Sequence, residues 1–186
     1  MLLAMPSSNL PEIAVLGAGS TAAAIVRRLV RAGFRVWVWD PVPARADALA
    51  PYGAWVAKSP AAASGDAAVV ITLLANADFT AEAMIGFEGA APAMRPGSLW
   101  LQMTDVADKW SDGFSALAEK HRLAYVDAEL AGDDGAAERG GLIVLAEGPH
   151  ALRDRSQPIF DAIARHTRWF DTDAWVGHTR CLSQAS

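Results

Sequence analysis

A glycine-rich turn near the N-terminus carries the clearest chemical signal in the chain. Residues 17–22 read Gly-Ala-Gly-Ser-Thr-Ala, which fits the pattern G-x-G-x-x-G/A. In that pattern the first glycine permits a tight turn, the second lets a pyrophosphate approach the backbone, and the small last residue lets a helix pack on a strand. Amides at the start of the following helix favour an anion. The residues expected to hold the diphosphate of a dinucleotide are Gly17, Ala18, Gly19, Ser20 and Thr21.

An aspartate stands where a ribose-binding acid is expected. Asp40 ends the second apolar run, 23 residues after Gly17. A carboxylate there can accept hydrogen bonds from both ribose hydroxyls of NAD and would repel the 2′-phosphate of NADP. No arginine follows Asp40 directly, although Arg45 is near. The sequence therefore predicts NAD or NADP as cofactor, with NAD preferred. A plainer alternative stays open, in which the glycines serve only the turn and Asp40 is a solvated strand end.

A mostly parallel sheet would bring these residues to one edge. Short apolar runs alternate with helix-period segments almost throughout, which predicts an α/β fold of the Rossmann type, doubly wound, with helices on both faces. The strands are expected at 13–16, 35–39, 54–56, 67–74, 99–102, 123–126, 141–146 and 168–170. The helices are expected at 21–32, 43–50, 77–85, 111–121 and 149–165. Residues 131–141, rich in glycine and acids, are expected to form a loop.

Composition limits the classes of partner and compartment. The 186 residues are 52% hydrophobic and 20% charged, as in a globular domain. The formal charge of -5 argues against a nucleic-acid partner and against an anionic membrane, because both need a basic face. The single cysteine, Cys181, together with the lack of a signal-like or membrane-spanning run, favours the cytoplasm. No His or Cys pair shows metal-ligand spacing, so no metal site is expected.

With these residues placed, the chain resembles the N-terminal half of the β-hydroxyacid dehydrogenase family. That family includes 3-hydroxyisobutyrate dehydrogenase, 6-phosphogluconate dehydrogenase and the related imine reductases. The glycine turn resembles its G-L-G-x-M-G. Four later segments resemble M-L-P-D/N at 69–76, L-R-P-G-S at 94–99, D-A-P-V-S-G-G at 127–133 and E-A-G-T-L at 138–142. The implied domains are an N-terminal extension at 1–10, an NAD(P)-binding Rossmann domain at 11–175, and a remnant of the interdomain helix or a tail at 176–186.

The resemblance also implies further contacts. The additional cofactor positions are Leu73, Leu74, Ala75, Asn76 and Thr104. The substrate signature D-x-S-T-x-x-P falls on residues 102–108, so the implied substrate positions are Thr104, Asp105 and Gly132. The chain departs from the family here, because Asp105 replaces a hydroxyl and Asp133 replaces a glycine. Acids at both places would repel the carboxylate of an ordinary hydroxyacid substrate.

No residue of the sequence is assigned as the catalytic proton donor or base. The family's catalytic lysine would fall near Ser183, but no lysine occurs after Lys120. Arg180 cannot act as a base, because a guanidinium does not release its proton in proteins. Imine reductases resemble the family without that lysine, so reductase chemistry stays open.

Three functions therefore remain as hypotheses. The first is the cofactor domain of an oxidoreductase that moves a hydride between nicotinamide and a small hydroxyacid, semialdehyde or imine. The second is a non-catalytic dinucleotide-binding module, either a sensor or a partner subunit, and the third is a truncated remnant of a longer protein. The family's C-terminal helical domain has no counterpart in the sequence, so apolar surface is expected near 169–176. That surface predicts a homo-oligomer.

Overall fold

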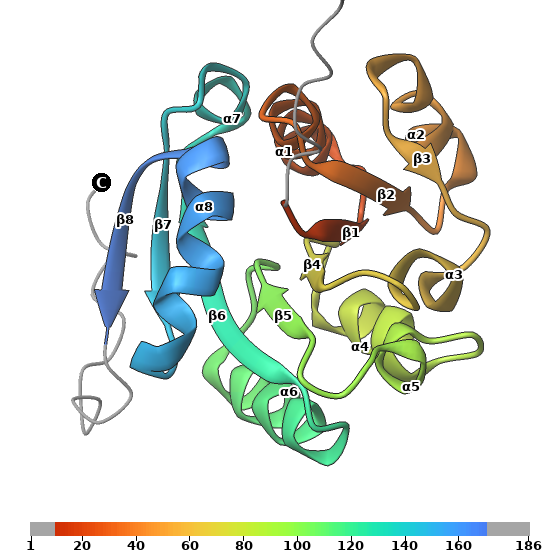
Figure 1. Ribbon diagram of the computed structural model, residues 1–186, viewed down its shortest axis with the longest axis vertical. Coiled ribbons are helices and arrows are strands. Elements are labelled where there is room, and N and C mark those ends of the chain that lie inside the picture. The colour runs from red at the N-terminus through yellow and green to blue at the C-terminus, as the bar shows by residue number, and fades with distance from the viewer. Residues whose placement is uncertain (1–9, 171–186) are drawn as a thin grey trace, which may run out of the picture.

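The computed structural model describes residues 10–170 and arranges them around one sheet (Figure 1). The strands are β1 (Glu12–Leu16), β2 (Arg35–Trp39), β3 (Trp55–Val56), β4 (Val69–Thr72), β5 (Leu99–Gln102), β6 (Ala124–Ala131), β7 (Leu142–Glu147) and β8 (Ala164–Phe170). The α-helices are α1 (Ser20–Arg31), α2 (Pro43–Asp47), α3 (Pro60–Ser64), α4 (Ala77–Ile85), α5 (Ala90–Ala93), α6 (Asp108–Lys120), α7 (Asp134–Arg139) and α8 (Arg153–Ile163). Two short 3-10 helices, η1 (Ala50–Tyr52) and η2 (His150–Leu152), complete the chain.

The strand order is β3-β2-β1-β4-β5-β6-β7-β8, and every neighbouring pair is parallel except β6 with β7. This confirms the predicted Rossmann-type α/β fold with a mostly parallel sheet. The order reverses between β1 and β4, which is the topological switch point where open α/β sheets bind ligands. Leu16 at the end of β1 pairs with Trp39 on one side and Thr72 on the other. The turns that follow these three strands therefore meet at one edge.

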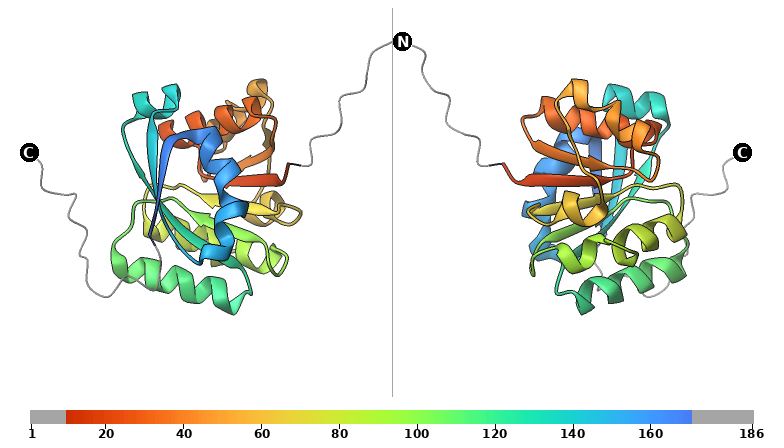
Figure 2. Two further views of the ribbon diagram at one scale, coloured as in Figure 1. Left: turned by 60° about the vertical axis from the view of Figure 1, so that its left-hand side comes forward. Right: turned by 90° about the vertical axis from the view of Figure 1, so that its right-hand side faces the viewer.

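Helices cover both faces of the sheet (Figure 2), and an apolar cluster lies on each face. Successive strand residues point to opposite faces, so Leu99 and Leu101 pack in one cluster and Trp100 packs in the other. The first cluster lies under α1, α2, α7 and α8, and the second lies under α3 to α6. Strands buried on both faces read as continuous apolar runs, which explains why β4 and β5 were recognisable in the sequence.

Helix α1 follows its sequence pattern closely. Ala22, Ile25 and Leu29 are buried on one face at helical spacing. Arg28 and Arg31 lie in the last turn, where a cation interacts favourably with the helix dipole. The chain then leaves the helix through Gly33 at a φ of +92°, a left-handed conformation that glycine adopts without steric cost.

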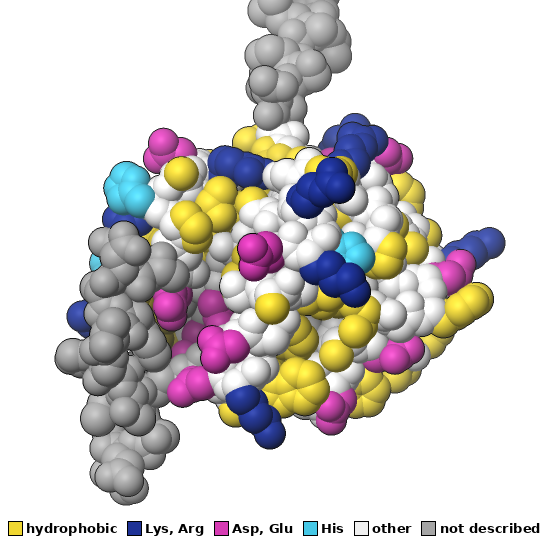
Figure 3. All heavy atoms as spheres, turned by 90° about the horizontal axis from the view of Figure 1, so that it is seen from below, with side chains coloured by type: hydrophobic (Ala, Val, Ile, Leu, Met, Phe, Trp, Pro, Cys, Tyr) yellow, Lys and Arg dark blue, Asp and Glu magenta, His cyan; other side chains and the backbone are white. Residues whose placement is uncertain are grey.

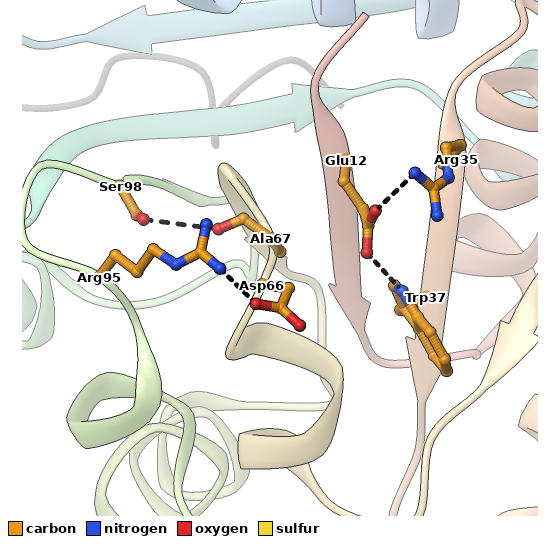
Figure 4. Close-up of polar contacts among 7 residues, drawn as sticks. All are labelled: Glu12, Arg35, Trp37, Asp66, Ala67, Arg95 and Ser98. Atoms are coloured by element: carbon orange, nitrogen blue, oxygen red, sulfur yellow. Dashed lines mark hydrogen bonds and ion pairs between the residues drawn. The ribbon is translucent and has the colours of Figure 1, made fainter.

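Polar contacts at the amino-terminal edge of the sheet tie neighbouring elements together (Figure 4). The Glu12 carboxylate accepts a hydrogen bond from Trp37 Nε1 at 2.6 Å and lies 3.3 Å from the Arg35 guanidinium. Arg95 forms an ion pair with Asp66 across the turn that precedes β5. These contacts lie at the opposite end of the strands from the glycine turn. They therefore join neighbouring elements but are not part of the predicted site.

The prediction of a loop at 131–141 is wrong, because residues 134–139 form α7. The Asp133 side chain accepts a hydrogen bond from Ala136 N at 2.6 Å and caps the helix. Gly140, at a φ of +71°, ends it in the left-handed conformation. Between these two ends Ala137 is fully buried in the cluster beneath α1. Tertiary packing thus stabilises a helix that is too short to be stable alone.

The C-terminal elements also differ from the prediction. The expected helix at 149–165 is divided into η2 and α8, and β8 begins at Ala164 instead of 168. Ala164 takes an extended conformation because it pairs with Leu142 of β7, and sheet pairing overrides the helical pattern. Helix α5 was not expected at all. Trp169 is half-buried against Phe160, with ring centroids 5.7 Å apart. Residues 171–176 of the expected apolar surface, like the tail at 176–186, lie outside the described residues.

The surface seen in Figure 3 carries acidic and basic side chains interspersed with apolar ones. Within residues 10–170 no helix is long and apolar enough to cross a membrane. The same residues contain no cluster of three or more His, Cys, Asp or Glu side chains suited to a metal ion.

Replacement of Trp100 tests the second apolar cluster. Trp100 is fully buried, packs on Phe114 and Tyr125, and donates a hydrogen bond from Nε1 to Thr72 Oγ1 at 2.9 Å. We expect Trp100→Ala to lower the free energy of unfolding by about 3–5 kcal/mol. Phe87→Ala is the control, because that ring is 91% exposed and its loss should change stability by less than about 0.5 kcal/mol. Urea unfolding followed by circular dichroism measures both; equal losses would contradict the assignment.

Candidate functional site

Gly17 is required by the packing of the turn after β1. A Cβ atom at this position would lie 2.0 Å from the carbonyl oxygen of Leu73, and the backbone φ is +119°. The Gly17 amide also donates a hydrogen bond to the Trp39 carbonyl at 2.8 Å. The turn is therefore bonded to the end of β2, and a side chain at residue 17 would collide with the backbone that follows β4.

Gly19 differs from Gly17 because the space beside it is open. A Cβ at Gly19 would have no heavy atom of the described chain within 4 Å, and its φ of -63° is ordinary for any residue. Gly19 is the N-cap of the 12-residue helix α1 and, having no side chain, provides no side-chain cap for its first amides. Uncapped amides at a helix start favour an anion. The open space beside Gly19 therefore lies next to the amides at the start of α1.

Asp40 holds the glycine turn to the end of β2. Its side chain is almost fully buried, and Oδ2 accepts a hydrogen bond from Ala18 N at 2.7 Å. Oδ1 accepts a second hydrogen bond from Val42 N at 2.8 Å and lies 3.9 Å from Arg45 Nη1. The alternative of a merely solvated strand end is therefore wrong. An ionised carboxylate has about four acceptor positions, so two such bonds leave capacity for ligand hydroxyls.

Thr104 positions the loop that follows β4. It is buried, and its Oγ1 accepts a hydrogen bond from Leu74 N at 3.0 Å and lies 2.9 Å from Thr80 Oγ1. The Thr104 amide and carbonyl are both held by the buried side chain of Gln102, at 2.7 and 2.9 Å. The Thr104 hydroxyl therefore holds the backbone of the 73–76 loop through the Leu74 amide. This support for the loop was not foreseen in the sequence.

The loop itself presents its last residues to solvent. Leu73 and Leu74 are half-buried, whereas Ala75 and Asn76 are exposed. Asn76 is the N-cap of α4, where its Oδ1 accepts a hydrogen bond from Phe79 N at 3.0 Å. Because β4 neighbours β1, this loop lies beside the glycine turn. The close approach of Leu73 to Gly17 brings the two segments together.

The predicted substrate positions lie after the next two strands. Asp105 is exposed and follows Thr104 at the end of β5. Gly132 is exposed and follows β6, with a φ of +136°, and a Cβ there would lie 2.9 Å from Leu142 Cδ2. Since β5 and β6 are parallel neighbours, both residues are on the same edge of the sheet as the glycine turn. Their contact with a substrate stays a prediction.

A carboxylate from α7 reaches the start of α1, which the sequence did not predict. Asp134 Oδ1 accepts a hydrogen bond from Thr21 Oγ1 at 2.6 Å. The hydrogen bonds from Thr21, and next from Ser20, lower the pKa of Asp134 below its ordinary value of 3.8. The two helices are joined further along by an ion pair between Arg27 and Glu138. Only the unforeseen helix brings this acid to the glycine turn.

A separate acidic hollow of about 680 Å³ lies between α6, β6 and the chain after β7. Its carboxylates are Asp108, Asp112, Glu119, Asp127 and Glu147. Ser111 Oγ donates a hydrogen bond to Asp127 Oδ2 at 2.6 Å. Burial, and secondarily the charge of Asp127, raise the pKa of Tyr125, which also lines the hollow. The lining residues lie outside all the predicted cofactor and substrate positions.

Known proteins with similar sequences share this arrangement of elements. The family model described as the NAD binding domain of 6-phosphogluconate dehydrogenase matches residues 12–177. An L-threonate dehydrogenase from Cupriavidus necator is 30% identical over 153 residues, which cover 82% of this chain and 52% of the relative. An NAD-dependent L-serine dehydrogenase from Pseudomonas aeruginosa is 28% identical over 155 residues, covering 83% of this chain and 52% of the relative.

A solved structure agrees with these matches. The 3-hydroxyisobutyrate dehydrogenase of Mycobacterium tuberculosis, determined with L-serine, superposes with a TM-score of 0.83 at 27% sequence identity. The match covers 87% of this chain and 55% of that one. The chain thus spans about half the length of the relatives it matches.

The same substitution, glycine to alanine, should change the free energy of unfolding very differently at the two glycines of the turn. Gly17→Ala should lower the free energy of unfolding by more than about 4 kcal/mol, because the new Cβ overlaps the Leu73 carbonyl and the φ is unfavourable. Gly19→Ala should change it by less than about 1 kcal/mol, because nothing in the described chain is near. Urea unfolding measures both values. A large loss of stability in the Gly19 variant would show that the space beside it is not open.

Proposed function

The chain belongs to the family of NAD-binding domains of 6-phosphogluconate dehydrogenase, and from this premise we propose that it holds NAD or NADP as the cofactor domain of a small-molecule oxidoreductase. The observation that carries the proposal is the open space beside Gly19, next to the uncapped start of α1. The amides of Gly19, Ser20 and Thr21 would hold the diphosphate there, since amides at a helix start bind anions without a charged side chain.

Asp40 would select the sugar next to the adenine. Its carboxylate is held by the amides of Ala18 and Val42, and its remaining acceptor positions suit the two ribose hydroxyls of NAD. The same charge disfavours a 2′-phosphate, although Arg45 lies 3.9 Å from Oδ1 and offsets part of it. The relative from P. aeruginosa is described as NAD-dependent, which supports the preference for NAD.

The second half of the sheet would receive the nicotinamide. In Rossmann folds each half of the sheet binds one mononucleotide, and Asp40 belongs to the half that binds adenosine. The nicotinamide half then lies over the ends of β4, β5 and β6, where residues 73–76, Thr104 and Gly132 are placed. When bound, the nicotinamide accepts or donates the hydride. The chain's own part is to orient that ring through the 73–76 loop, whose backbone Thr104 fixes.

The substrate class that we propose is a small hydroxyacid, semialdehyde or imine. The names of the relatives, an L-threonate dehydrogenase and an L-serine dehydrogenase, support a small polar substrate. The exposed carboxylates of Asp105 and Asp133 count against a substrate carboxylate at those two positions. No lysine follows Lys120, so no proton donor is assigned within this chain. The second candidate function is a non-catalytic dinucleotide-binding module.

Calorimetric titration with NADH and NADPH tests the proposal. The wild-type chain should bind NADH, and Gly19→Ala should weaken binding by at least about tenfold, because the methyl group fills the space proposed for the diphosphate. The stability of this variant provides the folding control. Absorbance of the reduced nicotinamide, measured with hydroxyacids, semialdehydes and cyclic imines, then separates the two candidates. Binding without turnover indicates the module, turnover indicates the enzyme, and absence of binding contradicts both.

Asp40→Ala should weaken NADH binding about ten- to hundredfold and narrow the difference between NADH and NADPH. The reason is that the substitution removes a charged acceptor both from the ribose site and from the Ala18 amide. Asp47→Ala is the matched control, because it removes an equal charge from an exposed position in α2. Calorimetry gives the two affinities for each variant. A wider preference for NADH in Asp40→Ala would overturn the role assigned to Asp40.

A further inference from the structure

Contacts of the carboxylate and of its helix place Asp134 at the start of α1. Its Oδ1 accepts a hydrogen bond from Thr21 Oγ1 at 2.6 Å. The helix that carries it is anchored at the other end, because Glu138 pairs with Arg27 of α1. Between these two contacts Ala137 is completely buried against the cluster beneath α1. The exposed carboxylate is therefore carried by a helix that is fixed against α1.

Its place in the sheet puts Asp134 on the nicotinamide side of the glycine turn. Helix α7 follows β6, and β6 lies on the side of β1 opposite to Asp40 and β2. A dinucleotide that placed its adenosine near Asp40 and its diphosphate on Ser20 and Thr21 would pass its nicotinamide end toward Asp134. The two hydroxyls that hold the carboxylate belong to the same residues whose amides would hold the diphosphate.

Resting on the proposed function, we propose that Asp134 is a specificity-determining residue of the dinucleotide site. Its charge makes the site discriminate between forms of the cofactor by their net negative charge. Its negative charge stands at the position where the start of α1 attracts an anion, so it opposes the diphosphate. The oxidised nicotinamide ring is cationic and the reduced ring is neutral. The same carboxylate therefore disfavours NADH, which carries one more net negative charge, more strongly than NAD⁺.

The charge is present under ordinary conditions. Hydrogen bonds from Thr21 and Ser20 lower the pKa of Asp134, so the carboxyl group is ionised throughout the neutral range. The side chain is exposed, and salt therefore screens its effect on a neighbouring phosphate. A charge effect is distinguishable from a packing effect by this dependence on salt.

Asp134→Asn isolates the charge, because the amide oxygen can still accept the hydrogen bond from Thr21. Asp133→Asn is the matched control: it removes the same charge one residue away, where the side chain caps α7 by accepting from Ala136 N. The probes are ADP-ribose, NAD⁺ and NADH, titrated by calorimetry at about 20 mM and about 500 mM NaCl. Thermal unfolding of both variants checks that α7 remains folded.

We expect Asp134→Asn to bind ADP-ribose and NADH about two- to fivefold more tightly at low salt, the range expected for one exposed charge at a helix start. NAD⁺ should gain less, and the gain should shrink at high salt. Asp133→Asn should change each affinity less. Unchanged or weaker binding of ADP-ribose by Asp134→Asn, or equal gains in the two variants, overturns this inference alone. If no variant and no wild-type protein binds any probe, the proposed function fails and this inference fails with it.

Discussion

The contact between Gly17 and the Leu73 carbonyl is the constraint on which the rest of the site depends. It joins the turn after β1 to the end of β4, at the point where the strand order of the sheet reverses. Because residue 17 has no side chain, the backbone of the turn can approach the Leu73 carbonyl before α1 begins. Gly19, two residues later, is glycine for a different reason, since the chain leaves the space beside it open instead of filling it.

Buried polar side chains hold this arrangement in place. Asp40 ties the turn to β2 through the Ala18 amide, and Thr104 ties the 73–76 loop to the end of β5 through the Leu74 amide. Both side chains are buried and accept hydrogen bonds from these amides, so each stabilises the backbone that would contact a dinucleotide. A residue expected to touch a ligand thus also shapes the surface that receives it, and its replacement changes both at once.

The departures from the family pattern gather on the nicotinamide side. Asp105 and Asp133 stand where the family has a hydroxyl and a glycine, and Asp134 reaches the start of α1 from α7. The adenosine side, with its glycine turn and Asp40, keeps the pattern. The chain therefore keeps the family pattern in the segments proposed to hold the adenosine half of the cofactor, and carries additional carboxylates in the segments that resemble the family's substrate motifs.

The sequence alone determined the Rossmann-type fold, the glycine turn and Asp40, because strand and helix periodicity, obligatory glycines and a strand-terminal acid are local features. The resemblance to the family, and not periodicity, assigned residues 73–76 to the cofactor. Only the tertiary structure decided that residues 134–139 are helical, that Asp40 faces the Ala18 amide, and that Asp134 meets Thr21. The physical reason is that these contacts join elements distant in the chain, and a short helix such as α7 is stabilised by burial against α1, which no local pattern of residues records.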